Sequence, residues 1–143
     1  MPPEAHGPDR RGLALIIHSA AFEKVHYALA TASAAAAVGR PVILFFAMGA
    51  TRALEANGGW RQLKADNGGT ATDADAAFEE LGIADFETLL AACVELGVRV
   101  MACEIGLAVE GLARQDLRPD LGLEEGGLAT LMLEAGDGNV VFV

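Results

Sequence analysis

The sequence predicts an α/β fold in which a mostly parallel sheet is covered by helices on both faces. Residues 13–17 and 42–47 are continuous apolar runs, the pattern of strands that are buried on both sides. A helical pattern lies between them, from residue 22 to residue 36. A strand, a helix and a strand at this spacing form a βαβ unit, and its crossover makes the two strands parallel.

The first helix is expected to follow Ser19, a good N-cap residue, and to stop at Gly39. Its inward stripe comprises Phe22, Val25, His26, Leu29, Ala32, Ser33 and Ala36. Pro41 then opens the second strand. From residue 48 to residue 82 the pattern weakens, with Gly-Gly pairs at 58–59 and 68–69 and a short acidic helix at 75–81. We expect turns or a flexible flap in this stretch.

The second half repeats the alternation of helix and strand. A helix capped by Asp85 ends at Gly97. Its expected inward residues are Phe86, Leu89, Leu90, Cys93 and Leu96. Strand 98–103 follows, and then a helix from Glu104. The residues expected on the inner side of that helix are Ile105, Ala108, Val109 and Leu112. A helix at 128–134 and a strand at 139–143 complete the pattern.

Length and composition indicate one domain. A chain of 143 residues, 52% of them hydrophobic, supplies ample material for a single core. We expect a flexible lead at 1–11, which includes His6, and one domain at 12–143. The lead does not have the pattern of a signal peptide, and the two cysteines are not arranged as a disulfide framework, so we expect a cytoplasmic protein.

Charge and hydrophobicity indicate which kinds of partner the protein can bind: nucleic acid, a membrane or other copies of itself. A net charge of −10 without a basic cluster disfavours nucleic acid. No apolar run approaches the ~20 residues that cross a bilayer, so we expect no membrane span. Surfaces this apolar are often buried between subunits, so we expect a homo-oligomer.

The carboxyl ends of parallel strands share one edge of a sheet, and ligands bind there. Three pairs of residues follow predicted strands: His18 and Ser19, Met48 and Gly49, and Cys103 and Glu104. Cys103 is the sharpest candidate, because a helix start directly after it would favour the nucleophilic thiolate. The alternative for Cys103 is a small buried hydrophobe at a strand end.

His18 is a candidate base, or a cation that stabilises the thiolate, although a hydrogen-bonded loop histidine is an alternative. The charge of Glu104 would oppose a neighbouring thiolate. Arg52 is a candidate to offset that charge or to hold an anionic substrate, and its alternative is a solvated surface arginine.

The sequence does not favour a metal or an organic cofactor. Cys93 and Cys103 are ten residues apart, without a Cys-x-x-Cys pair or histidines at ligand spacing. No strand is followed by a dinucleotide-binding glycine motif, and Gly106 to Gly111 lacks the residues that complete a phosphate loop. We therefore expect chemistry that needs neither.

Three blocks together give the chain its resemblance to a known family: residues 42–49, 96–103 and 126–135. In these blocks the chain resembles the DsrE/DsrF-like sulfur-relay proteins, some of them called peroxiredoxin-like, and the resemblance extends from Leu13 to Val143. It implies a single-domain three-layer sandwich of about five mostly parallel strands, assembled as a dimer, trimer or hexamer. It also implies a persulfide-carrying cysteine after an alanine at a strand end, which Ala102-Cys103 matches.

Three functions remain open at this point. The first is a sulfurtransferase-like carrier in which Cys103 takes sulfane sulfur from a donor protein and passes it to an acceptor protein's thiol, without a cofactor. The second is a non-enzymatic, oligomeric module that binds a small ligand or a protein at the strand ends. The third is a peroxide-reducing enzyme, for which Cys93 would have to serve as the resolving thiol.

Overall fold

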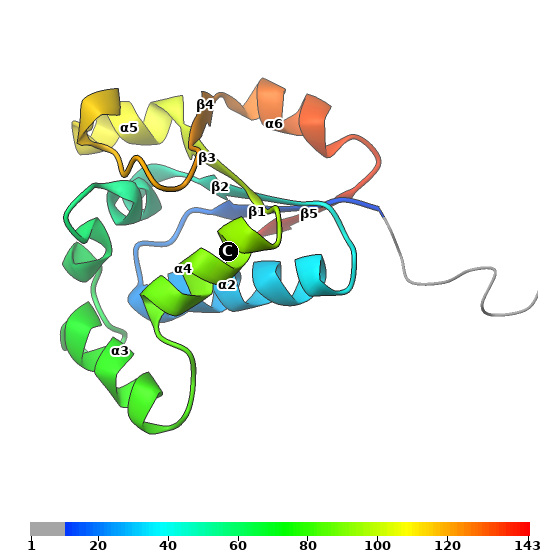
Figure 1. Cartoon of the computed structure of the whole chain (residues 1–143). Helices are drawn as coiled ribbons and strands as arrows, with labels where there is room; N and C mark the ends of the chain where they lie inside the picture. The colour runs from blue at the N-terminus through cyan, green and yellow to red at the C-terminus, as the bar shows by residue number, and fades with distance from the viewer. Residues whose placement is uncertain (1–10) are drawn as a thin grey trace, which may run out of the picture.

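The computed structural model describes residues 11–143, so all but the last residue of the expected flexible lead, His6 included, lies outside the described residues. Five strands form one sheet in the order β4-β3-β2-β1-β5, and every neighbouring pair is parallel (Figure 1). The strands are β1 (Leu13–Ile17), β2 (Val42–Phe46), β3 (Arg99–Cys103), β4 (Glu124–Gly126) and β5 (Asn139–Phe142). The α/β fold with a parallel sheet is therefore confirmed.

Helices cover both faces of the sheet. The α-helices are α2 (Phe22–Ala37), α3 (Ala71–Glu80), α4 (Phe86–Glu95), α5 (Glu104–Glu110) and α6 (Leu128–Ala135). Three 3-10 helices join them: η1 (Met48–Leu54), η2 (Gly59–Gln62) and η3 (Arg114–Asp116). In Figure 1, α2 and α4 lie on one side of the sheet and α5 and α6 on the other.

The sheet separates two apolar cores. The larger core includes Leu15 and Leu44 of the sheet, Phe22 of α2 and Phe86 of α4. The smaller core lies on the opposite face. Its members are Ala14, Ile16, Ile43, Phe45, Ala47, Met101, Cys103 and Leu131. Because neighbouring residues of a strand point to opposite faces, Ala102 belongs to the larger core and Cys103 to the smaller one.

The stretch after β2 is more ordered than the sequence pattern suggests. Thr51 and Leu54 of η1 and Trp60 of η2 are buried. Gly58 adopts a left-handed conformation, with φ of 76°, and a Cβ on Gly59 would lie 2.2 Å from the Arg52 carbonyl oxygen. The first Gly-Gly pair is therefore a packed turn. Helix α3 begins at Ala71 instead of Asp75, because the Thr70 side chain accepts a hydrogen bond from the Asp73 N–H and caps the helix.

Three local expectations were wrong. The N-cap of α2 is Ala21 instead of Ser19, which lies two residues before it and whose Oγ accepts a hydrogen bond from the Ala21 N–H. Leu96 is exposed because α4 ends at Glu95. In α5, the exposed side carries Ile105, Ala108 and Val109, whereas Gly106 and Leu107 are buried.

Candidate functional site

Cys103 ends β3 and is the N-cap residue of α5. Only 3% of the residue is exposed. It belongs to the smaller core, as does Ala47, which follows β2. Met48, the first residue of η1, is partly buried and packs against the same core. The structure thus brings Cys103 and Met48 into one cluster at the carboxyl edge of the sheet, as the strand pattern predicted.

Close backbone packing joins the loops at this edge. A Cβ on Gly106 would lie 2.6 Å from the Met48 backbone nitrogen, so α5 rests directly on the start of η1. A Cβ on Gly49 would lie 2.8 Å from the Cβ of Ala20, which follows β1. Met48 itself has a positive φ of 47°, uncommon for a residue with a side chain. The loops after β1, β2 and β3 are therefore contiguous.

His18 points to the same face of the sheet as Cys103 but lies two strands away. Its backbone N–H donates a hydrogen bond to the Val143 carbonyl, and its exposed ring lies 5.4 Å from that of Phe142 in β5. Strands β1 and β3 are separated by β2, which at the usual strand spacing puts the backbones of His18 and Cys103 about 10 Å apart. Ser19 is next to His18, and its N–H also donates to the Val143 carbonyl. A bound molecule would have to bridge His18 and Cys103.

Arg52 and Glu104 do not pair in the structure. The Arg52 guanidinium donates to Glu55 at 3.0 Å and to the Glu110 carbonyl at 2.7 Å, and it forms an ion pair with the Glu110 carboxylate at 3.5 Å. These contacts tie η1 to the end of α5. Glu104 is exposed at the first turn of α5, and one of its carboxylate oxygens lies 3.8 Å from the position of a Cβ on Gly127, at the start of α6.

Cys93 lies on the other side of the sheet. It is fully buried in the larger core, and its thiol donates a 3.4 Å hydrogen bond to the Leu29 carbonyl. Burial raises the pKa of the Cys93 thiol to about 11. Because Cys93 and Cys103 belong to cores on opposite faces, this fold does not provide Cys103 with a nearby resolving thiol.

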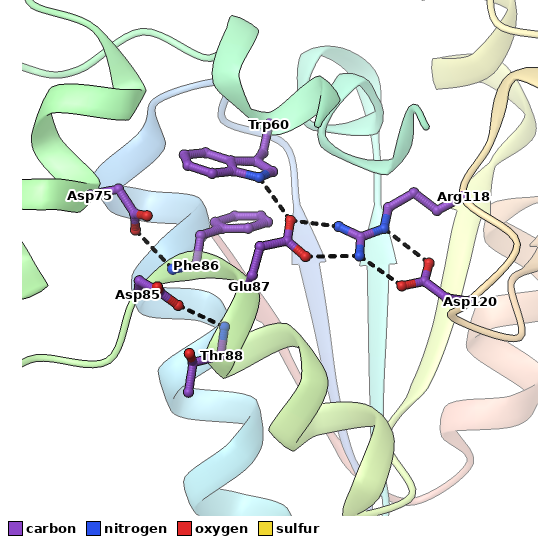
Figure 2. A network of polar contacts seen from close by, with 8 residues as sticks. All are labelled: Trp60, Asp75, Asp85, Phe86, Glu87, Thr88, Arg118 and Asp120. Atoms are coloured by element: carbon purple, nitrogen blue, oxygen red, sulfur yellow. Dashed lines mark hydrogen bonds and ion pairs between the residues drawn. The ribbon is translucent and has the colours of Figure 1, made fainter. Parts of the chain in front are cut away.

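A second polar cluster, which the sequence pattern did not predict, lies at the N-terminal end of α4 (Figure 2). Arg118 donates to both oxygens of Glu87, at 2.8 and 2.9 Å, and to both oxygens of Asp120, at 2.8 and 3.0 Å. Glu87 also accepts a 2.8 Å hydrogen bond from the indole N–H of Trp60, whose ring stacks on Phe86. The hydrogen bonds from Arg118 lower the pKa of Asp120. The one signal in the sequence is the single tryptophan, because a buried indole N–H needs an acceptor.

Two adjoining cavities flank Arg118. One has a volume of about 510 Å³ and is lined by Leu117, Leu123 and Arg114, among others. The other, of about 330 Å³, is lined by Arg61 and Glu87, among others. Both lie beside the segment 114–125, and neither is lined by Cys103 or His18. The positive charge of the Arg118 guanidinium is already paired with two carboxylates, those of Glu87 and Asp120, so we assign this cluster a structural role.

Residues 11–143 contain no group of three or more histidine, cysteine, aspartate or glutamate side chains arranged to hold a metal ion. None of their helices has the length and hydrophobicity that crossing a membrane would require.

Comparison with known proteins gives a match at the level of structure. The fold is similar to that of the YchN protein from E. coli, whose crystal structure superposes with a TM-score of 0.54 at 17% sequence identity. The match covers 92% of this chain and 99% of YchN. YchN has the DsrE/DsrF-like fold, so the resemblance inferred from the sequence is supported at the level of the fold. No family model and no curated protein sequence matches the chain.

Proposed function

We propose that this protein is a sulfur carrier that holds sulfane sulfur as a persulfide on Cys103. The observation that carries the proposal is the position of Cys103. It is the last residue of a central strand, at the edge where the loops after β1, β2 and β3 meet. The similarity to the fold of YchN is consistent with a sulfur-relay role.

The chemistry needs one thiolate and two protein partners. The Cys103 thiolate attacks the outer sulfur of a donor persulfide, the donor's S–S bond breaks, and the donor leaves as a thiolate. An acceptor thiolate then attacks the outer sulfur of the Cys103 persulfide and releases Cys103. The number of S–S bonds is conserved in each step, so neither a cofactor nor an oxidant is required. Both cysteines are free thiols, in keeping with a cytoplasmic location.

Neighbouring residues have proposed roles in this scheme. Because Cys103 is almost fully buried, access to its Sγ requires movement of the side chains that pack around it in the smaller core. At about 10 Å, His18 does not reach the thiol directly. We propose that it binds the incoming partner, as do Ser19, Gly49 and Glu104, while Arg52 holds η1 against α5.

A binding module of the same fold is the second candidate. The observation that favours it is the burial of Cys103, beside the exposed carboxylate of Glu104. A small ligand or a protein would then bind the strand-end loops without covalent chemistry. A peroxidase mechanism is disfavoured, because Cys93 is buried on the opposite face of the sheet.

Intact-mass spectrometry after incubation with polysulfide tests the carrier proposal. We expect a gain of whole sulfur atoms that reductant reverses, that Cys103→Ala abolishes and that Cys93→Ala retains. The two variants remove the same atoms, so Cys93→Ala controls for non-specific oxidation of buried thiols. An adduct that persists in Cys103→Ala would contradict the proposal, and a folded protein without any adduct would favour the binding module.

We further propose that the protein works as a homo-oligomer, a dimer, trimer or hexamer. The outward sides of α5 and α6 expose large apolar residues. These residues are Ile105, Val109, Leu128, Met132 and Leu133. Apolar patches of this kind commonly mark interfaces.

A further inference from the structure

We infer that strand β5 pairs edge to edge with β5 of a second copy of this chain, about a twofold axis that passes near Val141. This assignment goes beyond the proposed function, and it does not depend on sulfur chemistry.

The first observation is that β5 is an edge strand, and no other strand of residues 11–143 pairs with its outer side. It pairs with β1 on its other side (Figure 1). All four of its residues are exposed. Natural edge strands are usually shielded by charged residues, proline, bulges or a covering segment, whereas β5 contains neither a charged side chain nor a proline.

The second observation is the direction of the backbone groups. The Asn139 N–H donates to the carbonyl of Gly12, just before β1, and the Val143 N–H donates to the carbonyl of Ile16, within β1. Because successive residues of a strand alternate, the N–H and C=O groups of Val140 and Phe142 point away from β1. Two copies related by a twofold axis at Val141 would place Val140 of each opposite Phe142 of the other. Each such pair exchanges two bonds, so the edges would form roughly four hydrogen bonds.

The third observation is that both faces of this edge are apolar. Val140 and Phe142 pair with Ala14 and Ile16, so they share the face of the smaller core, and their pairing across the axis would match an aromatic with a β-branched side chain. Val141 is on the α2 side. There a groove of about 570 Å³ is lined by Tyr27 and Val38, among others.

That groove is continuous with β5. Arg40 lines it, and the Arg40 guanidinium donates a 2.5 Å hydrogen bond to the Asn139 side chain. Tyr27 is 73% exposed and Phe142 is 68% exposed. Together with the exposed Val38, Val140 and Val141, they present on the order of 500 Å² of apolar surface per copy, so a twofold pair that covered all of them would bury about 1,000 Å², the lower limit for a specific interface.

The lack of charged side chains on β5 makes this edge compatible with a second copy as the occupant. Each copy carries a net charge of −10, so two copies repel each other over most of their surfaces. Strand β5 is uncharged, and a twofold arrangement brings the same uncharged surface together from both sides.

Sedimentation analysis of the full chain and of matched variants tests this assignment. We expect wild type to be a dimer or an even-numbered oligomer, and Val140→Pro to halve its mass, because proline removes an outward N–H while leaving the bonds to β1 intact. Phe142→Asp should also halve the mass. Leu81→Asp is the control, since Leu81 is similarly exposed, at 75%, but lies at the turn after α3.

A second proline variant separates loss of pairing from loss of folding. Val141→Pro removes an N–H that points toward β1, so it should lower the melting temperature of the protein even when diluted to monomers, whereas Val140→Pro should melt as wild type does under the same dilution. A wild type that stays monomeric at about 100 μM, or an unchanged mass in both Val140→Pro and Phe142→Asp, would overturn the assignment.

Discussion

Gly106 is the residue at which α5 meets the backbone after β2. A Cβ at this position would lie 2.6 Å from both the Met48 nitrogen and the Thr51 Cγ2, and neither atom is at the end of a flexible chain. The Thr51 hydroxyl donates to the Met48 carbonyl at 2.6 Å and is fully buried, which fixes this part of η1. Glycine is therefore required here for lack of space, since its φ is not in the left-handed region.

We predict that Gly106→Ala destabilises the protein by about 1–3 kcal/mol, because α5 must move away from η1. Urea unfolding measures the change. Gly127→Ala is the matched control, since the nearest atom to its Cβ would be a Glu104 carboxylate oxygen at 3.8 Å, an ordinary contact. Equal stability of Gly106→Ala and wild type would show that the contact between α5 and η1 is not tight.

The two cysteines should differ in reactivity. A pKa raised to about 11 by burial leaves Cys93 almost entirely protonated at pH 8, and its thiol is held by the Leu29 carbonyl in the larger core. Cys103 is at a strand end, in the smaller core against which the partly buried Met48 packs. We predict that iodoacetamide at pH 8 labels Cys103 at least tenfold faster than Cys93 in the folded protein. Peptide mass mapping over time measures both rates, and labelling of both cysteines at one rate would indicate global unfolding instead.

At the scale of residues, the sequence predicted part of the candidate site. It placed Cys103 and Met48 at strand ends, and the structure puts them in one cluster, because an apolar run that stops at a polar residue marks a strand end well. It did not predict the separation of His18 from Cys103. That separation depends on strand order, since β2 lies between β1 and β3. The partners of Arg52 also depend on how α5 packs against η1.

Helix α4 shows what local signals predict at the scale of elements. The Asp85 side chain accepts a 2.8 Å hydrogen bond from the Thr88 N–H, as a capping aspartate should. Hydrogen bonding by the Thr88 side chain and then by this backbone N–H lowers the pKa of Asp85. A carboxyl whose pKa is lowered by folding adds stability above the pKa it has when unfolded, and that stability is lost as the pH falls through the folded pKa.

We predict that Asp85→Ala lowers the stability at pH 7 by about 1 kcal/mol, whereas Asp85→Asn, which can still accept the bond, loses less. The difference between wild type and Asp85→Ala should shrink as the pH falls below about 4, the pKa of an unfolded aspartate, and then through the lower pKa of the folded Asp85. Thermal melts between pH 3 and pH 7 measure this. A difference that stays constant over that range would exclude the charge of Asp85 from the effect.

Other elements escaped prediction for identifiable reasons. Strand β4 consists of Glu124, Glu125 and Gly126, which lack the apolar pattern of a strand, and it forms because β3 offers an edge. Helix α5 was expected to bury Ile105 and Val109. It buries Gly106 and Leu107 instead, because the approach of η1 is close enough that a glycine must face it.

At the scale of the whole molecule, Arg118 connects the loop before β4 with α4 and, through Glu87, with η2. Its guanidinium binds Glu87 in α4 and Asp120 in the loop before β4, and Glu87 in turn holds Trp60 of η2 (Figure 2). The Arg118 side chain is only 13% exposed. Sequence patterns describe residues that are close along the chain, so they could not predict a contact between residues 87 and 118.

We predict that Arg118→Met lowers the free energy of unfolding by about 1–2 kcal/mol, because it breaks charged hydrogen bonds in a partly buried position. Arg114→Met is the control. Arg114 also pairs with a carboxylate, that of Glu125, but its side chain is mostly exposed, so its loss should change stability by less than about 0.5 kcal/mol. Urea unfolding of the two variants measures the difference, and equal losses would show that the burial of Arg118 contributes nothing.

The order of the strands also has a consequence for the synthesis of the chain. Strand β1 pairs with β5, although β1 is the first and β5 the last of the strands in residues 11–143. At ribosomal rates of about 5–20 residues per second, β5 follows β1 by roughly 6–25 seconds. During that interval β2 and β3 can already stack beside β1, whereas the other edge of β1 stays open. A nascent chain of this protein is therefore most vulnerable to wrong pairing, and most in need of a chaperone, just before β5 emerges from the ribosome.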